Sequence, residues 1–443
     1  MKARTPNIDY TLHNDLCTGC GICVAVCPKT AISMRVENGR FLPEIDVTIC
    51  NNKKGCHSCY DVCPGVGVDL ISLAKEAFAD PDIREDKMVG RYTHCYYGYS
   101  TNNDIRYHSA SGGMVCQFLI WLLERGKIDG AIVTRFDKTN PLLVESFIAT
   151  SREEIMASRS SKYAPVSLHK AMCNLKSVKG SRYVVVGLPC HIQGIRKLMA
   201  HDHRLKEKVV GLFSLYCSSG RTFNLTEFLF KERGIPKESI NYFQYRDEGC
   251  LGKMVVKCPT KAGGEIKSVN EYGEYANVGD EVVYKEPFYS SYLPYRSFFI
   301  PHRCDLCIDH YGELGDVCFG DIHIKPFSDD KVGVNSLIVR KQEWLDSLEE
   351  CHREGFISLN EIPFETVSDS QTMSFRKKGR NGAFLQICRM LGRKVPQYDV
   401  DYLRTPTKRD WIDFFQNNFQ HFIGRHKVLW PIISRWKSKV KAC

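Results

Sequence analysis

Four closely spaced cysteines are the residues of this sequence that most plainly carry chemistry. Cys17, Cys20, Cys23 and Cys27 lie in the stretch LCTGCGICVAVCPK, and Pro28 follows the last of them directly. The chain has 443 residues and 21 cysteines. A chain of this length has enough core not to depend on disulfides, so we expect the thiols to serve metal or redox chemistry.

A second cysteine run follows the first. The C-x2-C-x2-C-x3-C-P spacing is that of bacterial ferredoxins, in which the fourth cysteine binds the neighbouring cluster. The stretch ICNNKKGCHSCYDVCPG repeats the pattern, with only its first cysteine displaced by three extra residues. We predict one 4Fe-4S cluster on Cys17, Cys20, Cys23 and Cys63, and another on Cys50, Cys56, Cys59 and Cys27.

Structural zinc is the alternative for these runs, because tetrahedral zinc sites also use cysteine pairs at C-x2-C spacing. Zinc does not call for two interlocked runs that each end in Cys-Pro, so the spacing favours the clusters. Gly19 and Gly21 would let the backbone fold closely around the first cluster and direct amides toward its sulfur atoms.

Four more cysteines lie farther along the chain. SRYVVVGLPC is typical of a buried strand ending at Cys190 before the helix-like HIQGIRKLMA, and VVGLFSLYC of a strand ending at Cys217. Ligands collect beyond the carboxyl ends of parallel strands. Cys304 and Cys307, in a hairpin-like loop with the sequence RCDLC, would complete a third cluster site if the fold gathers the four thiols. The alternative is two buried inert cysteines beside a small zinc or vestigial pair.

The elements that position these residues alternate between helices and strands after Ala79. SASGGMVCQFLIWLLERGKIDGAIVTRF predicts an amphipathic helix with Val115, Phe118 and Leu122 on one face, followed by the strand AIVTRF. The Ser-Gly-Gly entry leaves helix amides uncovered, and such N-termini attract phosphate or electron-rich ring atoms. A glycine-rich helix start is more often only a turn.

Composition narrows the class of protein. Apolar residues make up 43% and charged residues 25%, as in ordinary globular proteins. Of the net charge of +10, +7 lies in the last forty residues, which argues against a basic groove for nucleic acid. The longest apolar run, MVCQFLIWLL, is about half of the roughly 20 residues that span a membrane. Without a recognisable export signal, we expect a soluble cytoplasmic protein.

Several segments together resemble the family of coenzyme F(420) hydrogenase/dehydrogenase beta subunits, whose relatives include the iron-sulfur flavoprotein that reduces 7-hydroxymethyl chlorophyll a. These segments are SGGMVCQFLIWLLERGKIDGAIV, SRSSKYAP, VVVGLPCHIQGIR, VVGLFSLYC, CDLCIDHYGELGDVCFGDI and GVNSLIVR, and the resemblance covers roughly residues 92–345. The resemblance implies bound FAD and electron transfer between iron-sulfur clusters and a reducible partner. That partner is the deazaflavin coenzyme F(420) in the methanogen enzymes.

The resemblance also implies site residues. It assigns the third cluster to Cys190, Cys217, Cys304 and Cys307, in agreement with the strand-end argument. It places Ser111, Gly112 and Gly113 near the isoalloxazine ring and has Ser161, Lys162 and Tyr163 hold the FAD. Lys162 would lie near a phosphate or the N1 and O2 edge of the flavin; the alternative is a solvated surface lysine. Ser160 stands where the family tends to have glycine, and Gly315 where it tends to have alanine. No catalytic acid, base or nucleophile is assigned.

We expect three domains. Residues 1–79 form an α+β ferredoxin-like two-cluster module, and residues 80–345 an α/β flavin-binding domain with a largely parallel or mixed sheet. Residues 346–443 form a helical extension with a basic amphipathic tail. The predicted function is an FAD-dependent iron-sulfur oxidoreductase that exchanges electrons with a ferredoxin, a deazaflavin or another small-molecule donor or acceptor. The alternative is a non-catalytic electron-transfer subunit docked on a hydrogenase or dehydrogenase; a zinc-stabilised interaction protein is a third reading.

The tail combines aromatic and basic residues. Its first helical face carries Trp411, Phe414, Phe415 and Phe422, and its second part has Leu429, Ile432, Ile433 and Trp436 beside Arg435, Lys437, Lys439 and Lys441. Such segments either rest on anionic membranes as peripheral contacts or dock on their own protein.

Overall fold

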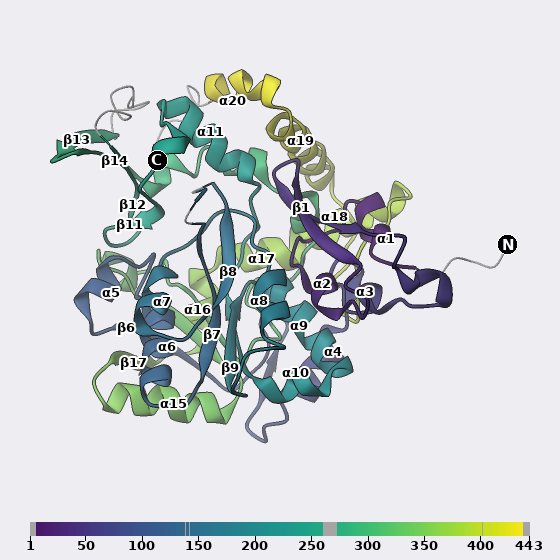
Figure 1. Ribbon diagram of the computed structural model, residues 1–443, viewed down its shortest axis with the longest axis horizontal. Coiled ribbons are helices and arrows are strands. Elements are labelled where there is room, and N and C mark those ends of the chain that lie inside the picture. The colour runs from purple at the N-terminus through teal and green to yellow at the C-terminus, as the bar shows by residue number, and fades with distance from the viewer. Residues whose placement is uncertain (1–5, 138, 141, 260–272, 401, 437–443) are drawn as a thin grey trace.

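The N-terminal region holds both early cysteine runs in short elements. In the computed structural model, the chain is described for residues 6–137, 139–140, 142–259, 273–400 and 402–436. The β1 and β2 strands pair antiparallel as a hairpin, and α2 lies beside it (Figure 1). The elements of this region are α1 (Asp9–His13), α2 (Ile22–Val26), β1 (Ile32–Glu37), β2 (Arg40–Ile45), η1 (Asn51–Lys54), α3 (Ser58–Asp61), β3 (Gly67–Val68) and α4 (Leu70–Ala77).

A mixed sheet forms the centre of the molecule (Figure 1). Within the described residues it has eight strands in the order β17-β6-β16-β15-β10-β9-β7-β8. The four strands β15, β10, β9 and β7 run parallel, and antiparallel partners flank them on both sides. This confirms the mixed form of the predicted sheet. Its strands are β6 (His94–Ser100), β7 (Gly130–Phe136), β8 (Val144–Ala149), β9 (Tyr183–Gly187), β10 (Val209–Leu215), β15 (Val317–Asp321), β16 (Asn335–Val339) and β17 (Ile357–Glu361).

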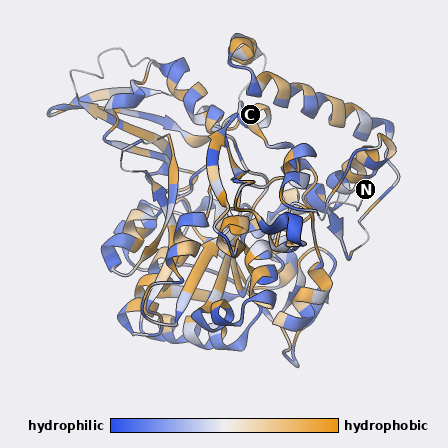
Figure 2. Ribbon diagram, turned by 45° about the vertical axis from the view of Figure 1, so that its right-hand side comes forward, coloured by the Kyte–Doolittle hydropathy of each residue, from blue (hydrophilic) through white to orange (hydrophobic). Residues whose placement is uncertain are grey.

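Helices cover both faces of the sheet, because its central strands are apolar on both sides. Successive side chains of β9 point to opposite faces, so Val184 packs with one helical layer and Val185 with the other. Figure 2 shows the hydrophobic residues along these strands. One layer contains α6 (Met114–Glu124), α7 (Arg152–Ala157) and α15 (Gln342–Arg353), and the other contains α8 (His169–Asn174), α9 (Pro189–His201) and α10 (His203–Lys208).

The N-terminal region shares its core with the second layer. Leu16 and Ile22 belong to the same buried cluster as Leu168 of the α8 N-cap and Ile192 of α9. The Leu168 N–H also donates to the Cys20 carbonyl at 2.9 Å. The two cysteine runs therefore lie directly against the α/β domain.

A second, smaller sheet was not predicted from the sequence. Within the described residues it has four strands in the order β11-β12-β14-β13, and it packs with α11. Arg233 of α11 and Glu286 of β14 form a fully buried ion pair at 2.7 Å. The elements are α11 (Phe223–Arg233), β11 (Tyr242–Asp247), β12 (Lys253–Pro259), β13 (Glu274–Val278), β14 (Glu281–Pro287) and α13 (Phe288–Ser291).

The C-terminal segment runs back to the N-terminal region (Figure 1). β18 pairs in parallel with β3, and the Asp399 carboxylate accepts from the amides of Ile71 and Ser72 at 3.0 and 2.9 Å. The segment contains α16 (Phe364–Ser370), α17 (Thr372–Phe375), the π-helical turn η5 (Arg376–Arg380), α18 (Asn381–Met390), β18 (Gln397–Tyr398), α19 (Lys408–Arg425) and α20 (Trp430–Trp436). Short elements elsewhere include β4 (Arg84–Asp86), β5 (Gly90–Tyr92) and α5 (Asn103–Tyr107).

The tail docks on its own protein along one face. Phe414 and Ile433 are buried in two core clusters, whereas Phe415 and Phe422 are more than half exposed, so the aromatic residues predicted to share one face are divided between two environments. Lys437, Lys439 and Lys441 lie outside the described residues. Among the described helices, none has the length and apolar character that a membrane span requires.

Candidate metal centres and flavin site

The eight early cysteines divide into two groups around two hollows. Cys17, Cys20, Cys23 and Cys63 line one, and Cys27, Cys50, Cys56 and Cys59 line the other. The last cysteine of each run thus lies with the opposite group, which is the crossed arrangement that the spacing indicates.

Electrostatic coupling follows the same division. Burial raises the pKa of Cys17 to about 12 and that of Cys20 to about 11, and the Cys63 thiol adds to both increases. Burial likewise raises the pKa of Cys59 to about 11, with Cys27 as its strongest thiol neighbour. Thiolates so close together in a buried place repel one another unless a cationic centre lies between them.

This donor set fits iron-sulfur clusters. Each hollow offers four sulfur donors, which is the ligand set of a 4Fe-4S cluster. Among the described residues, no three His, Cys, Asp or Glu side chains converge on a point that one metal ion would occupy. The thiols instead line the walls of each hollow.

Backbone amides support the sulfur atoms. Gly19 and Gly21 have φ of +75° and +80°, the left-handed region that glycine adopts without strain. The Gly19 N–H donates to Cys17 Sγ at 3.4 Å, and the Ala31 N–H donates to Cys27 Sγ at 3.3 Å. A Cβ on Gly21 would lie 2.3 Å from Ser167 Oγ, so this turn also needs glycine for contact with the α/β domain.

The four later cysteines, Cys190, Cys217, Cys304 and Cys307, also lie close together. The strand predicted to end at Cys217 ends two residues earlier, at Leu215 of β10, and Cys190 lies in the first turn of α9. The strand predicted to reach Cys190 ends at Gly187 instead, because Pro189 favours the first helical turn. Cys304 lies in the short helix α14 (His302–Asp305), so the predicted hairpin-like loop is wrong.

Their thiols form one electrostatic group beside the first N-terminal site. Burial raises the pKa of Cys217 to about 12, and the Cys304 and Cys307 thiols add to this increase. The pKa of Cys190 is also raised, by burial first, then by the thiols of Cys217 and Cys20. Cys20 therefore interacts both with its own group and with the later one.

Several polar residues around the third group gave no signal in the sequence. The Gly220 N–H donates to Cys304 Sγ at 3.3 Å, and Asn381 Nδ2 donates to the Cys307 carbonyl at 2.8 Å. Arg303 Nη2 donates to the Pro64 carbonyl at 2.9 Å and so joins α14 to the second cysteine run. Each contact links residues far apart in the chain, which spacing does not reveal.

The Ser-Gly-Gly stretch joins α6 to β16. The Ser111 hydroxyl donates to the Val334 carbonyl at 2.7 Å. A Cβ on Gly112 would lie 2.8 Å from the Gly98 carbonyl oxygen, so this position has room only for glycine. The Met114 N–H donates to Asn335 Oδ1 at 3.2 Å, so this amide of the helix entry, predicted to be uncovered, has a side-chain acceptor.

Hydrogen bonds between its own residues stabilise the loop with Ser161, Lys162 and Tyr163. Lys162 Nζ donates to the carbonyls of Ser158 and Arg159 at 2.6 and 2.5 Å, so this lysine is not a solvated surface residue. Burial lowers the pKa of Lys162 to about 7. Tyr163 packs against Tyr292, with ring centroids 4.4 Å apart.

A polar path connects this loop to the third thiol group. His310 Nδ1 pairs with the Cys217 carbonyl at 3.2 Å, and His310 Nε2 pairs with Gln371 at 3.1 Å. Gln371 Nε2 donates to the Asp321 carbonyl at 2.5 Å, and the Asp321 carboxylate pairs with Arg246 at 2.7 Å. Arg246 Nη1 also approaches the Tyr163 hydroxyl at 3.4 Å.

Comparison with known families agrees with this geometry. Residues 95–172 match the description "Coenzyme F420 hydrogenase/dehydrogenase, beta subunit N-term", and residues 180–364 match its C-terminal counterpart. The chain belongs to this family. In addition, residues 16–68 match a 4Fe-4S dicluster domain. The two hydrogenase/dehydrogenase matches therefore account for the large sheet, and the dicluster domain for both early cysteine runs.

Members of the hydrogenase/dehydrogenase family resemble this chain at modest identity. It is 26% identical over 385 residues to a coenzyme F420-dependent sulfite reductase of Methanocaldococcus jannaschii, covering 84% of this chain and 51% of that protein. It is 27% identical over 221 residues to one of the subunits of the F(420)H(2) dehydrogenase of Methanosarcina mazei, covering 48% of this chain and 56% of that protein. The chain thus spans about half the length of these two curated relatives.

A solved structure shares the fold of this chain. A chain from the F420-reducing NiFe hydrogenase complex of Methanosarcina barkeri superimposes with a TM-score of 0.51 at 18% identity, covering 73% of this chain and 99% of that one. The family match ends at residue 364, so Gln371 and Asn381 reach the third thiol group from outside it.

Proposed function

We propose that this protein is an iron-sulfur flavoprotein oxidoreductase that passes electrons between 4Fe-4S clusters, FAD and a ferredoxin, deazaflavin coenzyme or organic acceptor. The observation that carries the proposal is the arrangement of twelve thiols in three groups, with Cys20 of the first group interacting with Cys190 of the third. Adjacent groups of this kind suit stepwise transfer of single electrons.

Each thiol group would hold one 4Fe-4S cluster. The N-terminal clusters fall to Cys17, Cys20, Cys23 and Cys63, and to Cys27, Cys50, Cys56 and Cys59; the third falls to Cys190, Cys217, Cys304 and Cys307. When bound, the clusters carry single electrons and the flavin links them to a two-electron donor or acceptor. The chain itself buries the four thiols of the first group, half-buries the other eight and directs amides at sulfur.

The flavin assignment rests on two loops and the side chains between them. Ser111, Gly112 and Gly113 fix the entry of α6, and Ser161, Lys162 and Tyr163 lie in a loop joined to Asp321 through Arg246. We assign the FAD to this region because a polar path leads from it to the third thiol group. In this assignment Lys162 orders the loop through its own carbonyl contacts instead of reaching a phosphate.

The test is anaerobic purification followed by iron and sulfide analysis, cofactor release and mass identification. We expect 4Fe-4S clusters and FAD, with reduction by a ferredoxin or by reduced deazaflavin followed in single-turnover spectra. Nicotinamide is the comparison donor. A preparation that binds zinc and no sulfide would contradict the cluster assignment, and clusters without any flavin would contradict the FAD assignment alone.

The second candidate is an electron-transfer subunit without a substrate site of its own. The names of two relatives favour it. The Methanosarcina mazei relative is a subunit of the F(420)H(2) dehydrogenase, and a relative from Methanosarcina barkeri is the beta subunit of a coenzyme F420 hydrogenase. Turnover by the isolated chain supports the first candidate. Turnover only in a copurified complex supports the second.

The proposal includes a cytoplasmic location, because the twenty described cysteines are all free thiols and thiolate ligands need a reducing compartment. It also includes a peripheral membrane contact through α19. Ile412, Phe415, Phe419 and Phe422 lie at helical spacing and are each more than half exposed. Sedimentation with anionic liposomes tests this contact; a Phe415→Ser/Phe419→Ser variant should sediment less, and equal sedimentation would overturn it.

A further inference from the structure

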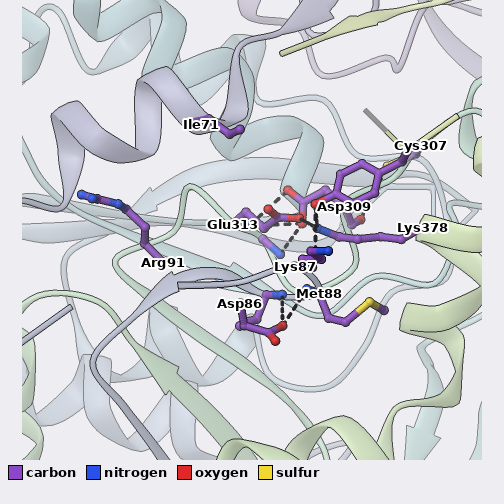
Figure 3. Close-up of polar contacts among 12 residues, drawn as sticks. Ile71, Asp86, Lys87, Met88, Arg91, Cys307, Asp309, Glu313 and Lys378 are labelled. Carbon is purple, nitrogen blue, oxygen red and sulfur yellow. Dashed lines mark hydrogen bonds and ion pairs between the residues drawn. The ribbon is translucent and has the colours of Figure 1, made fainter. Parts of the chain in front are cut away.

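Two consecutive buried lysines lie next to the third thiol group. Lys377 and Lys378 occupy the π-helical turn η5, a rare local structure that is frequent at functional sites. Lys378 Nζ lies 2.6 Å from the Glu313 carboxylate (Figure 3). The Lys378 ammonium also donates to the Tyr402 hydroxyl at 2.8 Å. Lys378 therefore has an acid as its partner.

Lys377 has a different environment. Its side chain is almost fully buried and has the thiols of Cys307, Cys217 and Cys304 as neighbours. Within the described part of the chain, no carboxylate lies at ion-pairing distance from Lys377. Lys377 therefore faces sulfur atoms, whereas Lys378 faces an acid.

A second contact fixes this lysine in place. Asn381, one turn farther along, donates to the carbonyls of Cys304 and Cys307 at 3.3 and 2.8 Å. The segment from Lys377 to Asn381 thus clamps the backbone of both cysteines and holds an ammonium against their sulfur atoms. It lies outside the family match, which ends at residue 364.

We propose that Lys377 is a positioning residue whose charge raises the reduction potential of the third cluster. This inference rests on the proposed function, which assigns a cluster to these thiols. The cluster gains one electron from a reduced ferredoxin, no bond breaks, and Lys377 keeps its proton. Because the reduced form carries one more negative charge, a fixed cation in a poorly solvated place stabilises it more than the oxidised form.

The test is an anaerobic redox titration of the purified holoprotein, followed by electron paramagnetic resonance. In Lys377→Met we expect the equilibrium constant for one-electron reduction of the third cluster to fall at least tenfold, a shift of about 59 mV toward negative potential. Lys377→Arg keeps the charge and should stay near the wild-type potential. Arg376→Met removes an exposed charge from the preceding position and should change the potential little, since solvent screens it.

Iron analysis separates this inference from the proposed function. A wild-type protein with only two clusters would contradict the third cluster itself. A wild-type protein with three clusters and an unchanged potential in Lys377→Met would overturn the role of Lys377 alone. If Lys377→Met does not fold, Lys377→Gln replaces it, and the same tenfold criterion applies.

Discussion

The N-terminal thiol groups and the third thiol group bring the same kind of side chain together in two different ways. All eight N-terminal thiols lie between Cys17 and Cys63, and their sulfur atoms receive backbone amides such as those of Gly19 and Ala31. The third site takes its thiols from three separate parts of the fold. It also has neighbouring side chains from distant parts of the sequence, including Lys377.

This difference shows how much of the sequence is needed to form each site. In the N-terminal region, one short sequence supplies the ligands, the glycines and the amides together. At the third site, the ligands meet only after β9, β10 and α14 have packed and the C-terminal segment has returned. We therefore expect the third site to be the more sensitive to distant changes, and the following predictions test that expectation.

The largest effect is expected from removing ligands of the third site. Replacing Cys304 and Cys307 with serine should remove about a third of the bound iron and sulfide, since one of three clusters is lost. Turnover should fall below detection, whereas the N-terminal clusters should remain. Iron and sulfide analysis with electron paramagnetic resonance measures this. Loss of all iron would show that the N-terminal sites are not independent.

Arg303 joins the two regions, so its removal should weaken the whole molecule. Its buried guanidinium donates to the Pro64 carbonyl at 2.9 Å and to the Tyr398 hydroxyl at 3.0 Å. Hydrogen bonds from a charged group contribute about 1.5–3 kcal/mol each, so Arg303→Met should lower the free energy of unfolding by about 3–5 kcal/mol. Denaturant unfolding measures the change.

Arg35 is the matched control for Arg303, because it is exposed on β1 and pairs with Glu37 and Glu44 at the surface. Arg35→Met should lower the free energy of unfolding much less than Arg303→Met, because solvent screens an exposed ion pair. Equal effects of the two substitutions would argue that Arg303 does not join the regions.

A buried acid near the third site should make stability depend on pH. Burial raises the pKa of Glu313 to about 7, with Asp309 adding to the increase and Lys378 and Arg340 opposing it. Between the unfolded value of about 4.3 and this value, the folded chain binds more protons than the unfolded chain. The free energy of unfolding should therefore fall as pH rises through this window, by up to about 3 kcal/mol.

Glu313→Gln should flatten that dependence, because the amide does not titrate. Unfolding curves of both proteins between about pH 4 and pH 8 measure the slope. The same slope in the variant would assign the dependence to another group. We expect the N-terminal sites to contribute nothing to this pH dependence, because the backbone amides that support their sulfur atoms do not titrate.

The sequence predicts most features that form within one short segment and few that depend on contacts between distant segments. The cysteine spacing predicts that Cys27 and Cys63 exchange places, and apolar periodicity predicts α6 and the strand after it. The burial of Lys377 gave no signal, because RKKGR is typical of a solvated surface and a π-helical turn has no clear sequence pattern. The four-stranded sheet was also missed. Such features depend on packing between segments that short-range spacing does not relate.

The smallest effects should come from two glycines whose amides both donate to sulfur. Gly19 has φ of +75°, and its added Cβ would lie 3.0 Å from the Phe41 carbonyl oxygen, so Gly19→Ala should cost about 1–2 kcal/mol. Gly220 has no such φ, and its Cβ would make an ordinary 3.4 Å contact with Cys304 Sγ. Gly220→Ala should change the free energy of unfolding by less than about 0.5 kcal/mol. If both substitutions cost the same, the left-handed turn encoded in the cysteine run does not distinguish the N-terminal sites from the third.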